Sequence, residues 1–237
     1  MKNPKLILAY LILFTFSVQR SQSQTLFLGW GPVHSHTKQT QRLVNGKDAW
    51  SYGYTQIPIG VEYPLNRFSA LLSLSTFNVL TDMRVGYRYY AGYAGTKITR
   101  VDLGVTYNIF KPNKLLFIKP FMAIGLQFAK YQADIWGEQV RVYGPDYFQT
   151  DYPTSHGHSN FQVVPSLGIK MGIKFLKRME FGVCIQGVYG YKQFQELTFK
   201  YTYKDDPLTE RVAKFVSNGT GLYSSFFLGV NFKKYKK

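Results

Sequence analysis

Residues 160–175, NFQVVPSLGIKMGIKF, alternate between apolar and more polar side chains over their whole length. Every second residue from Phe161 to Phe175 is apolar, and the residues between them include Gln162, Ser166 and Lys170. Successive side chains of a β-strand point to opposite faces, so this period of two predicts a strand with one apolar and one polar face. Which face points inward decides whether the chain is soluble or lies in a membrane.

The same alternation recurs along the chain. It is present near residues 25–31, 55–63, 67–77, 98–109, 115–131, 179–189 and 222–232. Together with residues 160–175 these segments predict about eight strands, an even number. Outside the N-terminus no run approaches the roughly 18 to 20 apolar residues of a membrane-spanning helix, so any membrane span must consist of strands.

The connections between these segments alternate in length. Short turns are predicted at residues 64–66, 110–114 and 176–178, and long polar connections at residues 32–54, 78–97, 132–159 and 195–220. Short turns at one edge and long loops at the other are typical of an outer-membrane barrel with both chain ends on the short-turn side. Within the second long connection Met83–Tyr90 alternate again, which indicates either a hairpin that rises above the membrane or one more strand. Because a single extra strand would put the short turns on opposite sides, we expect the hairpin.

The more polar face contains many small residues, namely Gly29, Gly60, Gly104, Gly125, Gly168, Gly172, Gly182, Gly190 and Gly229, with Ser69, Ser73, Ser166 and Ser225. Glycine weakens a solvent-exposed strand, whereas small residues suit the narrow interior of an eight-stranded barrel. Charges of both signs, which can pair inside a barrel, share this face: Glu62, Arg100, Asp102, Lys119, Lys170, Lys174, Glu180 and Lys192. The polar face is therefore predicted to point inward and the apolar face toward lipid.

We accordingly expect an all-β fold, a closed antiparallel up-and-down transmembrane β-barrel of about eight strands with long loops on one side. Residues 1–23 have the pattern of a signal peptide, with two lysines before an apolar stretch and Ser21-Gln22-Ser23 at the cleavage position. The barrel domain is expected over residues 24–237; an N-terminal anchor helix is the alternative for the first segment. The single cysteine, Cys184, excludes an internal disulfide and is expected inside the barrel.

The formal net charge is +16 at pH 7, and it falls to +13 without the three positive residues of the expected signal, which has no acidic residue. The lysines are dispersed, with no basic helix and no RNA-binding motif, so nucleic acid is not an expected partner. We expect attraction to anionic surfaces instead, in particular to outer-membrane lipid and lipopolysaccharide, whose headgroups carry phosphate.

Two segments carry a resemblance to a known family: residues 107–128, YNIFKPNKLLFIKPFMAIGLQF, and residues 221–232, GLYSSFFLGVNF. With a signal that ends in Ser-Gln-Ser-Gln, the chain resembles the small eight-stranded outer-membrane β-barrels (OmpA/OmpX-like), in the form abundant in Bacteroidota. The resemblance covers the whole mature chain as a pattern, without a signature motif. It implies a location in the cell outer membrane and a terminal aromatic, here Phe232, as insertion signal; the five residues after Phe232 depart from the commonest pattern.

All four histidines occur as two His-x-His pairs, His34 with His36 and His156 with His158. Each pair could offer two imidazoles to one Zn²⁺ or Cu²⁺ if the loops met. Because the pairs lie in non-adjacent loops, exposed loop histidines are the expected interpretation, and no metal-binding residue is predicted.

Residues His158-Ser159-Asn160 resemble part of the His-x-Ser-Asn motif of lipid A deacylases. Here His158 and Ser159 are adjacent, which would send them to opposite faces of a strand. There is also no phosphate-binding loop and no nucleophile elbow in the sequence. No catalytic and no cofactor-binding residue is therefore predicted.

These observations favour a non-enzymatic integral outer-membrane barrel whose long loops mediate adhesion, docking of a protein or glycan partner, or envelope integrity. The alternatives are a lipid-modifying outer-membrane barrel enzyme, a subunit of a secretion or barrel-assembly machine, and a soluble lipocalin-like ligand carrier, which also has eight alternating strands. A diffusion porin does not fit, because eight strands leave no wide lumen.

Overall fold

The computed structural model describes residues 24–39, 50–85, 89–110, 115–136, 141–142, 148–150, 154–158, 160–175, 178–203 and 206–232. Twelve β-strands account for nearly all of them. Within these ranges no helix is long and apolar enough to cross a membrane. The expected signal peptide, residues 1–23, lies outside the described residues.

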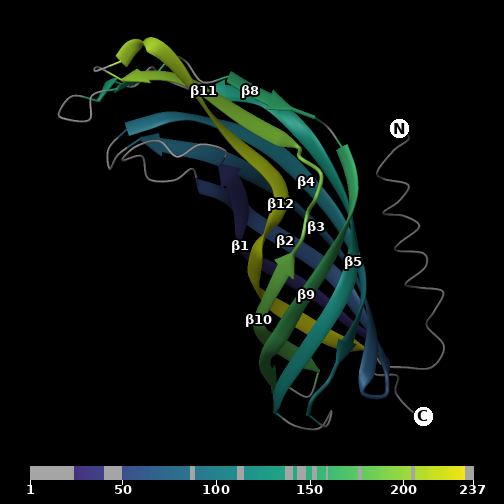
Figure 1. Cartoon of the computed structure of the whole chain (residues 1–237). Helices are drawn as coiled ribbons and strands as arrows, with labels where there is room; N and C mark the ends of the chain where they lie inside the picture. The colour runs from purple at the N-terminus through teal and green to yellow at the C-terminus, as the bar shows by residue number, and fades with distance from the viewer. Residues whose placement is uncertain are drawn as a thin grey trace, which may run out of the picture.

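Eight long strands form a closed antiparallel barrel (Figure 1). In chain order they are β1 (Gln24–Gln39), β2 (Trp50–Leu65), β3 (Phe68–Val85), β4 (Tyr89–Tyr107), β5 (Leu116–Trp136), β9 (Asn160–Phe175), β10 (Met179–Val188) and β12 (Asp206–Phe232). Each pairs with the next, and β12 pairs back with β1 from Gln24↔Phe232 to Gln39↔Phe215. Closure removes the free sheet edge that a bilayer would not tolerate, and it confirms the predicted barrel.

Burial follows the predicted alternation, with the polar face inward. On β9 the outward Leu167 is 67% exposed, whereas the inward Lys170 is only 3% exposed. The outer surface is consequently a continuous apolar belt, as a bilayer requires. A soluble lipocalin-like carrier would place these apolar rows inside, so that alternative does not fit the barrel.

The interior is filled by side chains and is less polar than predicted. One group of buried apolar residues lies toward the short-turn end, comprising Phe27, Leu71, Phe117, Phe121 and Phe227. A second group lies toward the long-loop end, comprising Val33, Phe77, Val79, Ile98, Ala129, Val164, Val188, Phe194 and Tyr223. The polar residues discussed below lie between and beside these two groups.

Several of the inward glycines lie directly across a strand pair from a phenylalanine: Gly60 from Phe27, Gly168 from Phe121, Gly172 from Phe117 and Gly182 from Phe227. A Cβ on Gly168 would lie 2.4 Å from Cζ of the Phe121 ring, closer than side chains ever approach. The small residues therefore leave space for specific aromatic rings rather than for a wet lumen.

The predicted long connections are largely strand. β3 and β4 continue to the pair Val85↔Tyr89, which confirms the predicted hairpin above the membrane. The third connection contains β6 (Arg141–Val142), β7 (Phe148–Thr150) and β8 (Thr154–Gly157), and the fourth contains β11 (Gln195–Tyr203) and the first part of β12. The prediction of polar loops over residues 195–220 was therefore wrong. A period-2 signal was present there, since Leu197 is flanked by Glu196 and Thr198 and is fully buried.

Where β10 ends, β11 replaces it as the strand paired with that side of β12. β10 pairs with β12 up to Val188↔Gly221, and β11 begins at Gln195↔Ser217. β7 and β8 pair with the other side of β11. These strands make a sheet beyond the long-loop end of the barrel, where Figure 1 shows β8 and β11 together. We call β8, β11 and residues 206–217 of β12 the upper sheet.

Candidate functional site

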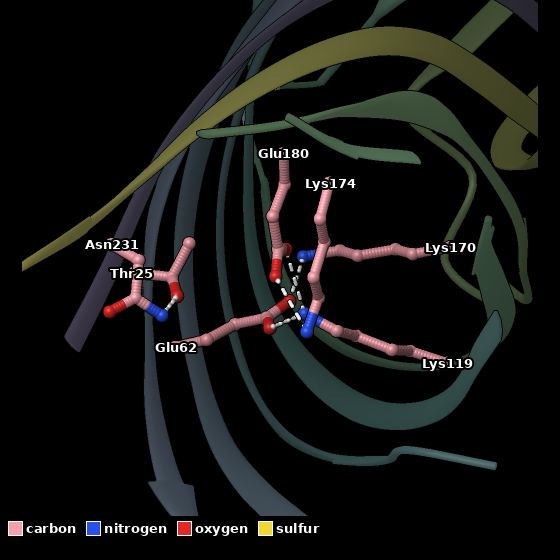
Figure 2. A network of polar contacts seen from close by, with 7 residues as sticks. All are labelled: Thr25, Glu62, Lys119, Lys170, Lys174, Glu180 and Asn231. Carbon is pink, nitrogen blue, oxygen red and sulfur yellow. Dashed lines mark hydrogen bonds and ion pairs between the residues drawn. The ribbon is translucent and has the colours of Figure 1, made fainter. Parts of the chain in front are cut away.

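A cluster of charged side chains crosses the barrel interior toward the short-turn end (Figure 2). Lys119 Nζ on β5 donates to Glu62 Oε2 on β2 at 3.0 Å and to Glu180 Oε2 on β10 at 2.9 Å. Lys170 Nζ on β9 donates to Glu62 Oε1 at 2.7 Å, and Lys174 Nζ lies 3.6 Å from Glu180 Oε1. The cluster joins four strands through side chains alone. The prediction that these inward charges pair is confirmed.

The geometry of this ion cluster explains its composition. Lys119 and Lys170 lie directly opposite each other on β5 and β9, an arrangement that is unfavourable for like charges. Glu62 approaches from β2 and gives one carboxylate oxygen to each ammonium group. All three side chains are nearly completely buried, so each charge depends on its partners.

Aromatic rings support the two lysines. Lys170 Nζ lies 3.6 Å from the centre of the Phe27 ring, and Lys119 Nζ lies 5.0 Å from that of Phe117. A cation over the face of an aromatic ring is attracted by the electrons of the ring. The ion cluster and the group of buried apolar residues toward the short-turn end thus form one packed layer.

A second polar group lies nearer the long-loop end. Arg100 Nε donates to Asp102 Oδ2 at 3.0 Å, and Arg100 Nη2 donates to Gln186 Oε1 at 2.9 Å. Gln186 Nε2 in turn donates to Ser166 Oγ at 2.9 Å. The guanidinium also lies 4.7 Å from the centre of the Tyr223 ring. These hydrogen-bonded side chains fill the barrel interior at a second level, above the ion cluster.

Between the two polar groups lies a small cavity of about 30 Å³, lined by Lys170, Arg100, Asp102, Ser75 and Cys184 among others. A cavity needs roughly 10–15 Å³ for each water molecule, so this one suits a few waters and no larger solute. Cys184 is at the cavity wall, which confirms its predicted interior position.

The mouth of the barrel is closed where the chain leaves β10. Gln162 Oε1 on β9 accepts hydrogen bonds from the backbone N–H groups of Tyr191 and Lys192 at 3.1 and 3.0 Å, and Gln162 Nε2 donates to Asn218 O at 2.9 Å. These hydrogen bonds turn the chain so that Phe194 is fully buried in the group of apolar residues toward the long-loop end. Gln162 was predicted only as an inward polar residue; nothing in the sequence marks its role at this junction.

Lys192 was predicted to be an inward charge, and this prediction was wrong. β10 ends at Val188, so the period of two does not continue through residues 189–194. The Lys192 side chain is exposed, and its Nζ donates to the backbone oxygen of Phe161 at 3.1 Å.

The upper sheet is held together by exposed and half-buried ion pairs. Glu196 on β11 accepts hydrogen bonds from Lys214 Nζ at 3.0 Å, Gln193 Nε2 at 3.1 Å and Thr198 Oγ1 at 3.2 Å. These donors, Lys214 foremost, hold the pKa of the Glu196 carboxyl below its ordinary value. Near the tip, Lys200 Nζ lies 2.8 Å from Glu210 Oε1.

The two His-x-His pairs are not brought together. All four histidines are exposed, with His34 and His36 on β1 and His156 on β8. β12 and β11 lie between β1 and β8, which at about 4.8 Å per strand separates the pairs by roughly 14 Å. In the described residues no group of three or more His, Cys, Asp or Glu side chains is placed to hold a metal. Ser159, of the deacylase-like triplet, lies outside the described residues.

No protein-family model and no curated protein matches this chain. Among solved structures it is similar to the outer membrane protein OprG from Pseudomonas aeruginosa, with 9% identity, 91% of this chain and 98% of that chain covered, and a TM-score of 0.52. A major outer membrane protein from Thermus thermophilus is similar at 10% identity, with 89% and 98% covered and a TM-score of 0.49. Membership of the OmpA/OmpX-like or Bacteroidota-type barrels stays a prediction. The chain has the fold of the small eight-stranded outer-membrane β-barrels.

Proposed function

We propose that this chain is a non-enzymatic integral protein of the cell outer membrane whose upper sheet is a docking surface for a protein or glycan outside the cell. The carrying observation is the length of β12, which at 27 residues far exceeds the roughly 9–11 residues that a transmembrane strand needs. Its first part, from Asp206 to Ser217, pairs with β11 beyond the barrel. The chain therefore projects an ordered sheet rather than a simple loop.

The interior supports this proposal over transport. The ion cluster, the Arg100 group and Phe194 block the barrel at three successive levels, and the cavity between the first two holds only a few waters. Because side chains fill its interior, we expect this protein to act through its exposed outer surfaces. At the tip of the upper sheet Leu208 is 96% exposed, so its side chain is available for an apolar contact with a partner.

Adhesion of whole cells tests the proposal. Cells that express the protein should bind a panel of immobilised glycans and matrix proteins more strongly than cells that lack it, and Leu208→Ser should reduce that binding. His34→Gln, an exposed change outside the upper sheet, is the control. Each variant is first checked for a shift in gel mobility on boiling, so that a folding defect is recognised. Equal binding with and without the correctly folded protein would contradict the docking function.

The non-enzymatic part of the proposal has its own test. The purified, folded protein is incubated with lipopolysaccharide, and the lipid A product is examined by mass spectrometry. We expect the acyl chains and phosphates of lipid A to be unchanged. Loss of an acyl chain would instead establish the lipid-modifying alternative.

A further inference from the structure

Two lysines face each other on the outer surface of the barrel. Lys97 on β4 and Lys130 on β5 lie directly opposite, both on the outward parity of their strands, and both are exposed. Like charges in this position repel. Inside the barrel the equivalent pair, Lys119 and Lys170, has Glu62 between its ammonium groups. In the part of the chain that the structure describes, neither Lys97 nor Lys130 makes an ion pair with a carboxylate.

Aromatic side chains and a third lysine adjoin this pair. Phe128 lies two residues before Lys130 on the same face of β5, and its ring centre is 5.0 Å from that of Phe161 on β9. Lys192 Nζ donates to the backbone oxygen of Phe161 at 3.1 Å. Two ammonium groups thus lie beside one aromatic pair on the outside of β4 and β5, and a third, that of Lys192, lies at the backbone of Phe161.

The patch lies at the upper boundary of the apolar belt. The stretch from Leu116 to Phe128 rises roughly 30 Å along the barrel axis at about 3.3 Å per residue and the usual strand tilt. The apolar band of such barrels is about 25 Å tall. Lys130 and its neighbour Lys97 therefore lie just beyond the hydrocarbon, at the depth of the lipid headgroups.

We propose that Lys97, Lys130 and Lys192 bind the phosphate groups of lipid A in the outer leaflet, with Phe128 and Phe161 packing against the lipid below them. Lipid A carries two phosphates on a rigid sugar unit at this depth, which suits ammonium groups that no carboxylate of the described chain neutralises. The inference rests on the proposed location in the outer membrane, because that location places this end of the barrel in the lipopolysaccharide leaflet.

Titration of the folded, detergent-solubilised protein with bisphosphorylated lipid A, followed by native mass spectrometry, tests the site. We expect the double variant Lys97→Gln/Lys130→Gln to bind about fivefold more weakly for each lysine removed, the factor that corresponds to ~1 kcal/mol per basic residue near an anionic membrane surface. Lys200→Gln, which removes a lysine of the upper sheet, should bind like the unmodified protein. Dephosphorylated lipid A should bind all three proteins weakly and equally.

The outcomes separate the two proposals. A protein that never reaches a heat-modifiable form in the outer membrane would contradict the proposed location. A correctly folded double variant that binds bisphosphorylated lipid A as tightly as the unmodified protein would overturn the phosphate site. Equally tight binding of phosphatidylglycerol by the unmodified protein would also overturn it, because the patch would then respond to any anionic lipid.

Discussion

Gly60 on β2 lies directly opposite Phe27 on β1, and the ring covers it so closely that a Cβ on Gly60 would lie 2.4 Å from Phe27 Cζ. On another side, that Cβ would lie 2.6 Å from the backbone oxygen of Leu72. The same ring is 3.6 Å from Lys170 Nζ. The absence of a side chain at Gly60 therefore sets the position of a ring that supports the ion cluster.

Replacement of Gly60 by valine should destabilise the barrel. The new side chain would meet both a buried ring and a backbone oxygen, and overpacking of this kind typically costs about 1–3 kcal/mol. We expect the urea midpoint of unfolding in detergent micelles to fall, with less of the fast-migrating folded form on unboiled gels.

Gly187→Val is the matched control. Gly187 is exposed on the lipid face of β10, and the nearest atom to a Cβ there is the Leu167 backbone oxygen at an ordinary 3.8 Å. Its urea midpoint should change little. Equal losses in the two variants would mean that the Gly60–Phe27 contact is not the cause.

The inward and outward faces of the barrel strands were predictable because apolar and polar side chains alternate along each strand. The partners of the small inward residues were not predictable. Whether Gly60 meets Phe27 depends on the register of β1 against β2, and this register is shifted between Gly31 and Val33. The sequence indicates that aromatic rings and glycines share the interior, but the register of the paired strands determines which ring covers which glycine.

The same limit applies to the charges. Glu62, Lys119 and Lys170 were predicted to point inward and to pair, yet their mutual contacts depend on strands far apart in the chain. Lys192 was misplaced because a period of two holds only while a strand continues, and β10 ends four residues earlier, at Val188. The upper sheet was interpreted as loop because most of its residues are polar, and the few buried apolar ones, such as Leu197 and Phe215, give only a weak alternation.

Substitution of Glu62 by glutamine should destabilise the barrel strongly. It would leave Lys119 and Lys170 facing each other with only Glu180 as a carboxylate bonded to Lys119. Removal of one partner from a buried ion pair typically costs about 3–5 kcal/mol. The free energy of unfolding from urea titrations in lipid vesicles measures the loss.

Two companion variants make this prediction specific. Glu62→Gln combined with Lys170→Met should recover part of the loss, because the lysine no longer lacks a partner. Glu210→Gln, which breaks the exposed pair with Lys200, should cost at most ~1 kcal/mol. An effect of Glu62→Gln as small as that of Glu210→Gln would show that the ion cluster does not stabilise the barrel.

The upper sheet should loosen in acid. Because the pKa of folded Glu196 is lowered by its hydrogen bonds, its stabilising contribution is complete above the unfolded-state pKa, roughly 4.3, and is lost as the pH falls through the folded-state pKa. Hydrogen exchange of the β11 amides, corrected for intrinsic rates, should accelerate below pH 4. Glu196→Gln should reduce this pH dependence, and amides between Leu116 and Phe128 in the belt should not share it.

Cys184 should react with a water-soluble maleimide only after unfolding. Its side chain borders a cavity of about 30 Å³ between the two polar groups, and a maleimide reagent is far larger than a few water molecules. We expect no labelling of the folded protein in detergent over hours and rapid labelling in urea. Tyr191→Cys in a Cys184→Ala background is the control, because Tyr191 is 54% exposed and its replacement should react in the folded state. Rapid labelling of Cys184 in a protein that still shifts on boiling would mean that the interior opens to solutes in the native barrel.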